Sequence, residues 1–243
     1  MTPSLIISTL APLGKLRATI NIGNPVLAGL AAGATEPHGV SVDIARELAR
    51  RLGVPAELVI CATAAKAVEA VKAGACDITF LAVDPARAVD IDYAAPYVVI
   101  AGAYMVKQDS PLTDNAQVDR PANRVAVGKG SAYDLFLTRE LKHATLVRFH
   151  SSQEVVDGFM AQGLEVAAGV KQQLEADAKR VPGLRLLPGQ FMEIRQAIGA
   201  PKGRAAAGEY LLAFIEELKA AGFIAAALKR HGIEGAAVAP PDR

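Results

Sequence analysis

The chain has 243 residues, of which 51% are hydrophobic and 21% are charged, and its formal net charge is +1. This length suits two compact α/β lobes or one large domain, and the composition excludes long disordered regions. Because the charges are balanced and no basic run is interleaved with aromatic residues, nucleic acid is excluded as an expected partner. The apolar runs fall short of the roughly 18 residues that cross a bilayer, so no transmembrane segment is expected.

The N-terminal stretch predicts no export signal, and the cysteines and histidines predict no metal site. Residues 1–20 lack a positively charged start and a full apolar segment, so they predict no export signal. Cys61 and Cys76 follow no metal spacing and are expected to be buried structural thiols. The four histidines are scattered along the chain, so we expect no metal site and no other cofactor.

The first half of the chain is predicted as an alternation of strands and helices. Apolar residues alternate or run continuously in the strands and recur at helical spacing in the helices, with glycines at the expected ends. The first strand leads into the loop Gly23-Asn24-Pro25, and Gly53 is a helix stop. The predicted strands cover residues 16–23, 56–61 and 76–83, and the predicted helices cover residues 40–53 and 64–74.

The same β-α-β-α-β order returns further along the chain, which predicts a duplicated α/β lobe. Such alternation favours mostly parallel, doubly wound sheets with helices on both faces. The repeated strands are expected over residues 123–130, 144–149 and 164–170, and the repeated helices over residues 131–141 and 151–163.

Two strand-like segments, residues 102–121 and 189–204, are expected to connect the lobes, and the tail over residues 207–232 is predicted to be helical with an interruption at Gly222. We therefore expect two lobes joined by a two-strand hinge, which permits closure on a ligand in a cleft between them. Lobe 1 is assigned to residues 1–105 plus 196–243, and lobe 2 to residues 106–195.

Ligands of open α/β sheets bind at the carboxyl ends of the strands. That rule selects Asn24 after the first strand, Ala82 and Val83 at the end of the third, and the glycine-rich turn before Ser131. It also selects Lys171, which directly follows the last strand of the second lobe.

The segment "VAVGKGSAYD" reads as a strand, a turn and a helix start. The backbone amides of Ser131, Ala132 and Tyr133 are candidates to bind an anion, helped by the helix dipole. An ordinary N-cap at Ser131 is the alternative. The segment lacks the third glycine of a dinucleotide fingerprint and the upstream glycine of a Walker A loop.

Arg87 follows a buried strand by a few residues, and its planar guanidinium suits a carboxylate. The alternative is a surface ion pair with Asp84, Asp90 or Asp92. Lys171 is a candidate second cation for the ligand site, and the alternative is an ordinary solvated lysine. No Ser-His-Asp order, GxSxG elbow or HExxH motif is present, so no catalytic residue is expected and the protein is not predicted to be an enzyme.

Three segments, "GVSVDIARELARRLGV", "VEAVKAGACDITFLAVDPARAVDIDYAAPYV" and "VAVGKGSAYD", resemble the family 3 solute-binding proteins over nearly the whole chain. The resemblance implies the type II periplasmic-binding-protein fold, a small ligand in an interlobe cleft, and an ABC transporter permease as partner. It implies that Arg87 grips a ligand carboxylate, helped by Ser131 and main-chain amides. It also implies a monomer in the periplasm, although the missing export signal leaves the cytoplasm as an alternative.

The sequence departs from the family pattern at several positions. Ala82 and Asp84 replace residues with hydroxyl groups near the arginine, and small residues around Ala28 and Ala62 replace aromatic walls. Lys171 falls where the family has an aspartate that binds the ligand's α-ammonium group. Because a lysine repels an ammonium, the hypothesis is that the ligand is an anion, such as a small mono- or dicarboxylate or an oxo acid, and not an ordinary amino acid.

Two alternatives from other functional classes stay open. The same fold includes cyclohexadienyl dehydratases, which act on prephenate-like acids, although Lys171 replaces the acidic residue that those enzymes use. The second alternative is a cytoplasmic metabolite-sensing module, for which the sequence has no DNA-binding helix-turn-helix before the first lobe.

Overall fold

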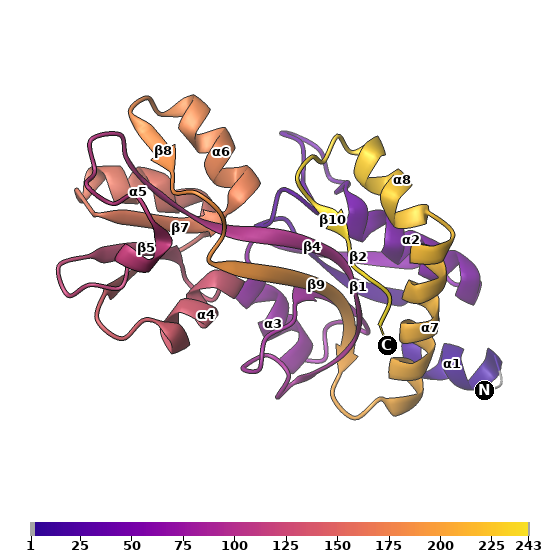
Figure 1. Ribbon diagram of the computed structural model, residues 1–243. Helices are drawn as coiled ribbons and strands as arrows, with labels where there is room; N and C mark the ends of the chain where they lie inside the picture. The colour runs from indigo at the N-terminus through magenta and orange to yellow at the C-terminus, as the bar shows by residue number, and fades with distance from the viewer. Residues whose placement is uncertain (1–2, 243) are drawn as a thin grey trace. The chain divides into compact units, whose positions relative to one another are not determined.

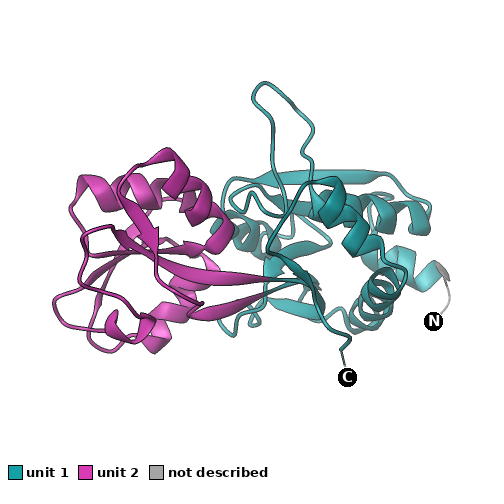
Figure 2. Ribbon diagram, turned by 45° about the horizontal axis from the view of Figure 1, so that its top comes forward, with its two compact units in different colours: residues 1–99, 195–243 teal, residues 100–194 magenta. Residues whose placement is uncertain are grey.

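The structure, a computed structural model, describes residues 3–242. It divides into two compact units, which are coloured separately in Figure 2. Unit 1 comprises the chain up to Val99 together with the chain from Arg195 onward, and unit 2 comprises Ile100–Ile194. The chain therefore leaves unit 1, builds unit 2 and returns to complete unit 1.

Unit 1 contains a parallel strand arrangement covered by helices (Figure 1). Strand β1 pairs in parallel with β2, starting with Leu16 opposite Ala56, and a parallel bridge between Ala18 and Ile78 brings in the start of the next strand. Gly53 ends helix α2 in the left-handed conformation (φ 68°), which confirms the predicted stop. The elements are β1 (Leu16–Asn21), α2 (Val40–Leu52), β2 (Ala56–Cys61), α3 (Ala64–Lys72) and β3 (Thr79–Ala82).

The rest of unit 1 comes from the two ends of the chain. Helix α1 (Pro3–Leu10) contacts α7 (Ala205–Ala220), and α7 continues into α8 (Phe223–Arg230) after a break at Gly222. The break confirms the predicted interruption. Helix α1 was not expected from the sequence. Both cysteines of unit 1 are buried and free, as predicted.

Two long strands, β4 (Ile91–Lys107) and β9 (Met192–Pro201), carry the chain across the boundary between the units. Strand β3 pairs with β9 in antiparallel orientation, and β4 pairs in the same way with β7 (Val166–Val170) and with the short β10 (Ala237–Val238). The prediction of mostly parallel sheets is therefore wrong at these strands. Strands β4 and β9 run opposite to the strands with which they are paired here. Antiparallel neighbours need no helical crossover between them.

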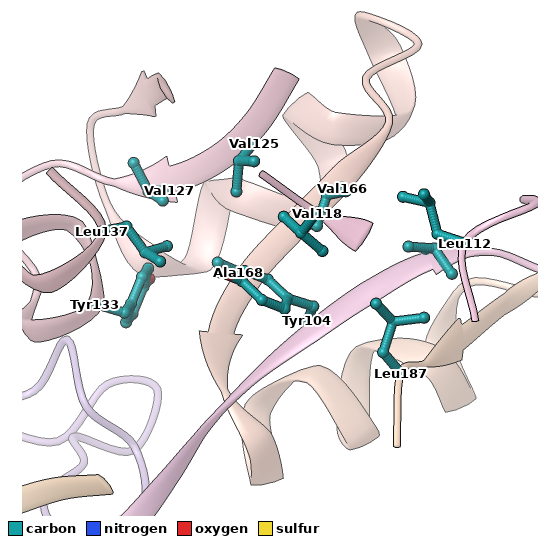
Figure 3. Packing of buried hydrophobic residues seen from close by; sticks show 11 residues of the cluster. Tyr104, Leu112, Val118, Val125, Val127, Tyr133, Leu137, Val166, Ala168 and Leu187 are labelled. Atoms are coloured by element: carbon teal, nitrogen blue, oxygen red, sulfur yellow. The ribbon is translucent and has the colours of Figure 1, made fainter. Parts of the chain in front are cut away.

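Unit 2 repeats the pattern of a parallel sheet with covering helices. Strand β5 pairs in parallel with β6 on one side and with β7 on the other, and β8 is added at the edge of β4. A cluster of buried apolar side chains, drawn in Figure 3, fills the space between these strands and α4. The remaining elements are η1 (Asn115–Gln117), β5 (Arg124–Gly128), α4 (Ala132–Glu140), β6 (Thr145–Phe149), η2 (Ser152–Glu154), α5 (Val155–Ala161), α6 (Lys171–Arg180) and β8 (Leu184–Leu186).

Within residues 3–242, every helix is too short or too polar to serve as a membrane span. In the same part of the chain, no three side chains of His, Cys, Asp or Glu gather as metal ligands.

Candidate functional site

In unit 1, several predicted site residues come together at one edge of the sheet. Strands β1 and β3 run parallel, so the loop that contains Asn24 and the end of β3 at Ala82 lie at the same edge. Val83 follows and is 44% exposed, and its amide donates a hydrogen bond to the Arg195 carbonyl of β9 at 2.9 Å. The register of β3 and β9 sets Gln196 opposite Ala82.

Arg87 lies inside unit 1 rather than on its surface. Its side chain is only 3% exposed, and its Nη1 donates to the carbonyl oxygen of Ala82 at 3.0 Å. The Tyr93 hydroxyl donates to the same carbonyl at 3.1 Å. Burial lowers the pKa of the Arg87 guanidinium, and the neighbouring Tyr93 and Asp84 oppose that change.

The alternative of a surface ion pair for Arg87 is therefore wrong. Asp90 pairs with Lys72 at 3.1 Å, and Asp92 pairs with Lys202 at 3.3 Å. Asp84 is buried, and its Oδ1 accepts the Ala86 amide at 2.8 Å within the turn. The turn from Ala82 to Tyr93 thus contains a buried cation that is held close to the carboxyl end of β3.

Asn24 has an unmet hydrogen-bonding group. Its backbone carbonyl accepts the amides of Leu27 and Ala28, both at 3.1 Å, which fixes the loop after β1. Its side-chain Oδ1 is buried and has no hydrogen-bond partner among the described residues. A buried polar atom of this kind is normally satisfied by a ligand or by water.

In unit 2, only some of the predicted backbone donors at the N-terminus of α4 can bind an anion. Ser131 is the N-cap, and its Oγ accepts the Asp134 amide at 3.1 Å. Its own amide donates to the Gly128 carbonyl at 3.0 Å, so the expectation that this amide is available is wrong. In the described part of the chain, the amides of Ala132 and Tyr133 have no acceptor, as is usual for the first turn of a helix.

A carboxylate of the protein already occupies part of this helix end. Asp134 is buried, its Oδ2 accepts the Gly130 amide at 2.8 Å, and its Oδ1 accepts Arg148 Nε at 2.9 Å. Arg148 balances the charge of Asp134. At the N-terminus of α4, only the backbone amides of Ala132 and Tyr133 therefore remain to bind a further anion.

The side chain of Tyr133 does not face a ligand. It lies in the buried cluster of Figure 3, is 2% exposed, and donates from its hydroxyl to Ser152 Oγ at 2.8 Å. The Ser152 carbonyl also accepts Gln173 Nε2 at 2.9 Å, and a Cβ on Gly128 would lie 2.9 Å from the Ser152 backbone. Ser152 therefore ties the ends of β5 and β6 to the first turns of α4 and α6, a role that the sequence did not reveal.

Lys171 lies where the sequence predicted, directly after β7, and it also begins helix α6. Its side chain is 45% exposed, and its Nζ is 4.0 Å from Glu175. Lys129 follows the neighbouring parallel strand β5 and is also exposed. The two lysines make the carboxyl edge of the unit 2 sheet cationic.

Solved structures with the same fold come from solute-binding proteins. The solute receptor for L-cysteine of Neisseria gonorrhoeae superposes with a TM-score of 0.80 at 26% identity, covering 93% of this chain and 92% of that one. The cysteine-binding protein of Campylobacter jejuni gives 0.78 at 20% identity, covering 94% and 92%. An ancestral amino acid-binding protein, described as a precursor of cyclohexadienyl dehydratase, gives 0.77 at 18% identity, covering 92% and 97%.

The two units with their helix-covered sheets and two crossing strands thus define a protein of the type II periplasmic-binding-protein fold, as the sequence predicted. The family model of the bacterial extracellular solute-binding proteins, family 3, matches residues 27–234, and the chain belongs to that family. No curated protein matches the sequence.

Proposed function

We propose that the protein captures a small organic acid and delivers it to an ABC transporter. The observation that carries this proposal is the cationic edge of unit 2. Lys171 follows β7, and α4, with two amides that have no acceptor in the described part of the chain, follows the neighbouring parallel strand β5. A carboxylate suits both kinds of donor, since charge-assisted hydrogen bonds contribute roughly 1.5–3 kcal/mol each. An α-ammonium group would meet repulsion from Lys171.

Arg87 supports the same proposal from unit 1. Because Arg87 is buried, its guanidinium has lost most of its hydration, and the lowered pKa reflects that loss. A ligand carboxylate close to the carboxyl end of β3 would offset the cost of that burial. A guanidinium has five N–H donors, of which Nη1 donates to the Ala82 carbonyl.

The proposal is tested by titration calorimetry of the purified protein with two panels of ligands. The acid panel contains succinate, malate, glutarate and 2-oxoglutarate, and the amino-acid panel contains L-cysteine, L-arginine and L-glutamate. We expect binding of at least one acid and weak or no binding of the amino acids. Tight binding of an amino acid with no binding of any acid would overturn the proposal.

The variant Lys171→Asp examines the role of the lysine. It is expected to weaken binding of the acid by about 10-fold or more and to improve binding of zwitterionic amino acids, because it replaces repulsion of the ammonium by attraction. Lys179→Asp is the matched control, since Lys179 is exposed in the last turn of the same helix. Equal effects of the two variants would show that only net charge matters.

We propose that the protein is not an enzyme, although one structural neighbour is an ancestor of a dehydratase. Lys171 supports this proposal, because it stands where the dehydratases use an acidic residue as proton donor. Incubation with prephenate or arogenate is expected to give no aromatic product. Formation of such a product at a rate above the uncatalysed one would contradict the proposal.

Family membership supports a site of action outside the cytoplasm, with a transporter permease as the partner. Fractionation of native cells tests this location. Recovery of the protein only with cytoplasmic markers would favour a role as a metabolite sensor or scavenger instead.

A further inference from the structure

Gln196 is a largely buried residue whose carboxamide reaches solvent and has no hydrogen-bond partner among the described residues. It lies on β9, is 7% exposed, and its backbone takes part in the pairing with β3. A carboxamide offers two donors and an accepting oxygen, all of which a ligand can use. An isolated glutamine of this kind indicates a position that is completed by another molecule.

The position of Gln196 points to the ligand proposed above. Gln196 is opposite Ala82, whose carbonyl accepts Arg87 Nη1, so the carboxamide belongs to the same edge of the unit 1 sheet as the buried cation. Asn24, with its unpartnered Oδ1, lies at that edge after β1. Two uncharged groups without a hydrogen-bond partner among the described residues therefore accompany one guanidinium.

The charges at this edge indicate the chemistry of the group that Gln196 would meet. The residue opposite Gln196 and the next one on β9, Ala197, are apolar. The carboxylate of Asp84 accepts a backbone amide of its own turn and lies beside Arg87. An ammonium group would find no separate carboxylate here, whereas a hydroxyl or carbonyl oxygen matches a carboxamide.

We propose that Gln196 is a specificity-determining residue that hydrogen-bonds an uncharged oxygen of the ligand, a hydroxyl or an oxo group next to a carboxylate. The ligand class is thereby a small hydroxy or oxo acid. This inference rests on the proposed function, since it assumes that the protein binds an organic acid. When that oxygen is a hydroxyl, the Asn24 Oδ1 accepts a hydrogen bond from it or from a neighbouring hydroxyl.

The test compares acids that differ by a single oxygen, using the full-length protein. The two pairs are malate against succinate and 2-oxoglutarate against glutarate, measured by calorimetry on the wild type and on Gln196→Leu. We expect the wild type to prefer the oxygen-bearing acid of at least one pair by 10-fold or more. A site built to bind an oxygen group rejects an analogue that lacks it. Gln196→Leu is expected to abolish that preference by weakening only the oxygen-bearing acid.

A second measurement shows that the variant is folded. Without ligand, Gln196→Leu is expected to melt within about 2–4 °C of the wild type, because the carboxamide reaches solvent and forms no hydrogen bond that the substitution would break. Gln162→Leu, at an exposed position of unit 2, is the matched control and should change neither the preference nor the binding of any acid.

The outcomes separate the two proposals. If the wild type binds no organic acid, the proposed function fails. If the wild type binds acids but does not discriminate within either pair, or if Gln196→Leu keeps the wild-type preference, the role of Gln196 is wrong while the proposed function stands.

Discussion

Asp77 is a fully buried carboxylate that depends on two arginines. Its Oδ1 lies 2.9 Å from Arg17 Nη2 and 3.4 Å from Arg204 Nη1, and its Oδ2 accepts Arg17 Nε at 3.0 Å. Asp77 precedes β3, whereas Arg204 lies just before α7, so the group joins distant parts of unit 1. Removing one member leaves buried charge without compensation.

We therefore expect Asp77→Asn to lower the free energy of unfolding by about 3–5 kcal/mol, as measured by urea denaturation. Asp109→Asn, at an exposed position, is the control and should change it by less than about 0.5 kcal/mol. A loss of less than about 1 kcal/mol in Asp77→Asn would show that water replaces the missing charge.

For single residues, the sequence predicted the location at a strand or helix end better than it predicted burial and side-chain contacts. Lys171, Ser131 and Ala82 lie at strand or helix ends as expected, because strand ends are marked by the apolar runs before them. The burial of Arg87 could not be foreseen, since it depends on a turn that folds back on β3. Gln196 gave no signal, because its burial depends on pairing with a strand more than a hundred residues earlier in the chain.

Helix α2 carries a local charge cluster that makes its contribution to stability depend on pH. Glu47 accepts hydrogen bonds from Arg50 and Arg51, both at 2.8 Å, and these bonds lower the pKa of Glu47 from 4.5 to about 2. Since the pKa is depressed in the folded state, the stabilisation is complete above about pH 4.5 and is lost as the pH falls towards 2.

Glu47→Gln is expected to lose about 1 kcal/mol at pH 6, a modest value because solvent screens the pair, and to differ less from the wild type at about pH 3. Urea unfolding at both pH values measures the difference. A gap between the two proteins that is equally large at low pH would contradict the assignment of the stabilisation to the ionised carboxylate.

Gly39, just before α2, is required by its backbone conformation and by its surroundings. Its φ is 122°, and an added Cβ would overlap the carbonyl oxygen of Leu27. Gly39→Ala is expected to destabilise the protein by about 1–3 kcal/mol, seen as a lower melting temperature. Gly208→Ala in α7, where an added Cβ meets nothing within 4 Å, is the control and should stabilise by about 0.5–1 kcal/mol.

The elements that the sequence predicted well are those with a strong apolar pattern. Strand β2 and helix α2 match their predicted ranges closely, and Gly53 and Gly74 both have the positive φ of a helix end. Helix α6 was missed because only Leu174 is buried in it, which leaves no apolar stripe to detect. The length of β4 was also missed, since its pairing partners are remote in sequence.

The order of the units along the chain affects how the whole protein is made. Unit 2 is one continuous stretch, Ile100–Ile194, whereas unit 1 needs both the chain up to Val99 and the chain from Arg195 onward. On the ribosome, unit 2 is therefore fully synthesised while unit 1 still lacks α7 and α8, whose buried faces complete its interior. Since domains generally fold as units, we expect the nascent chain to hold a folded unit 2 beside an incomplete unit 1, the stage at which chaperones are most needed.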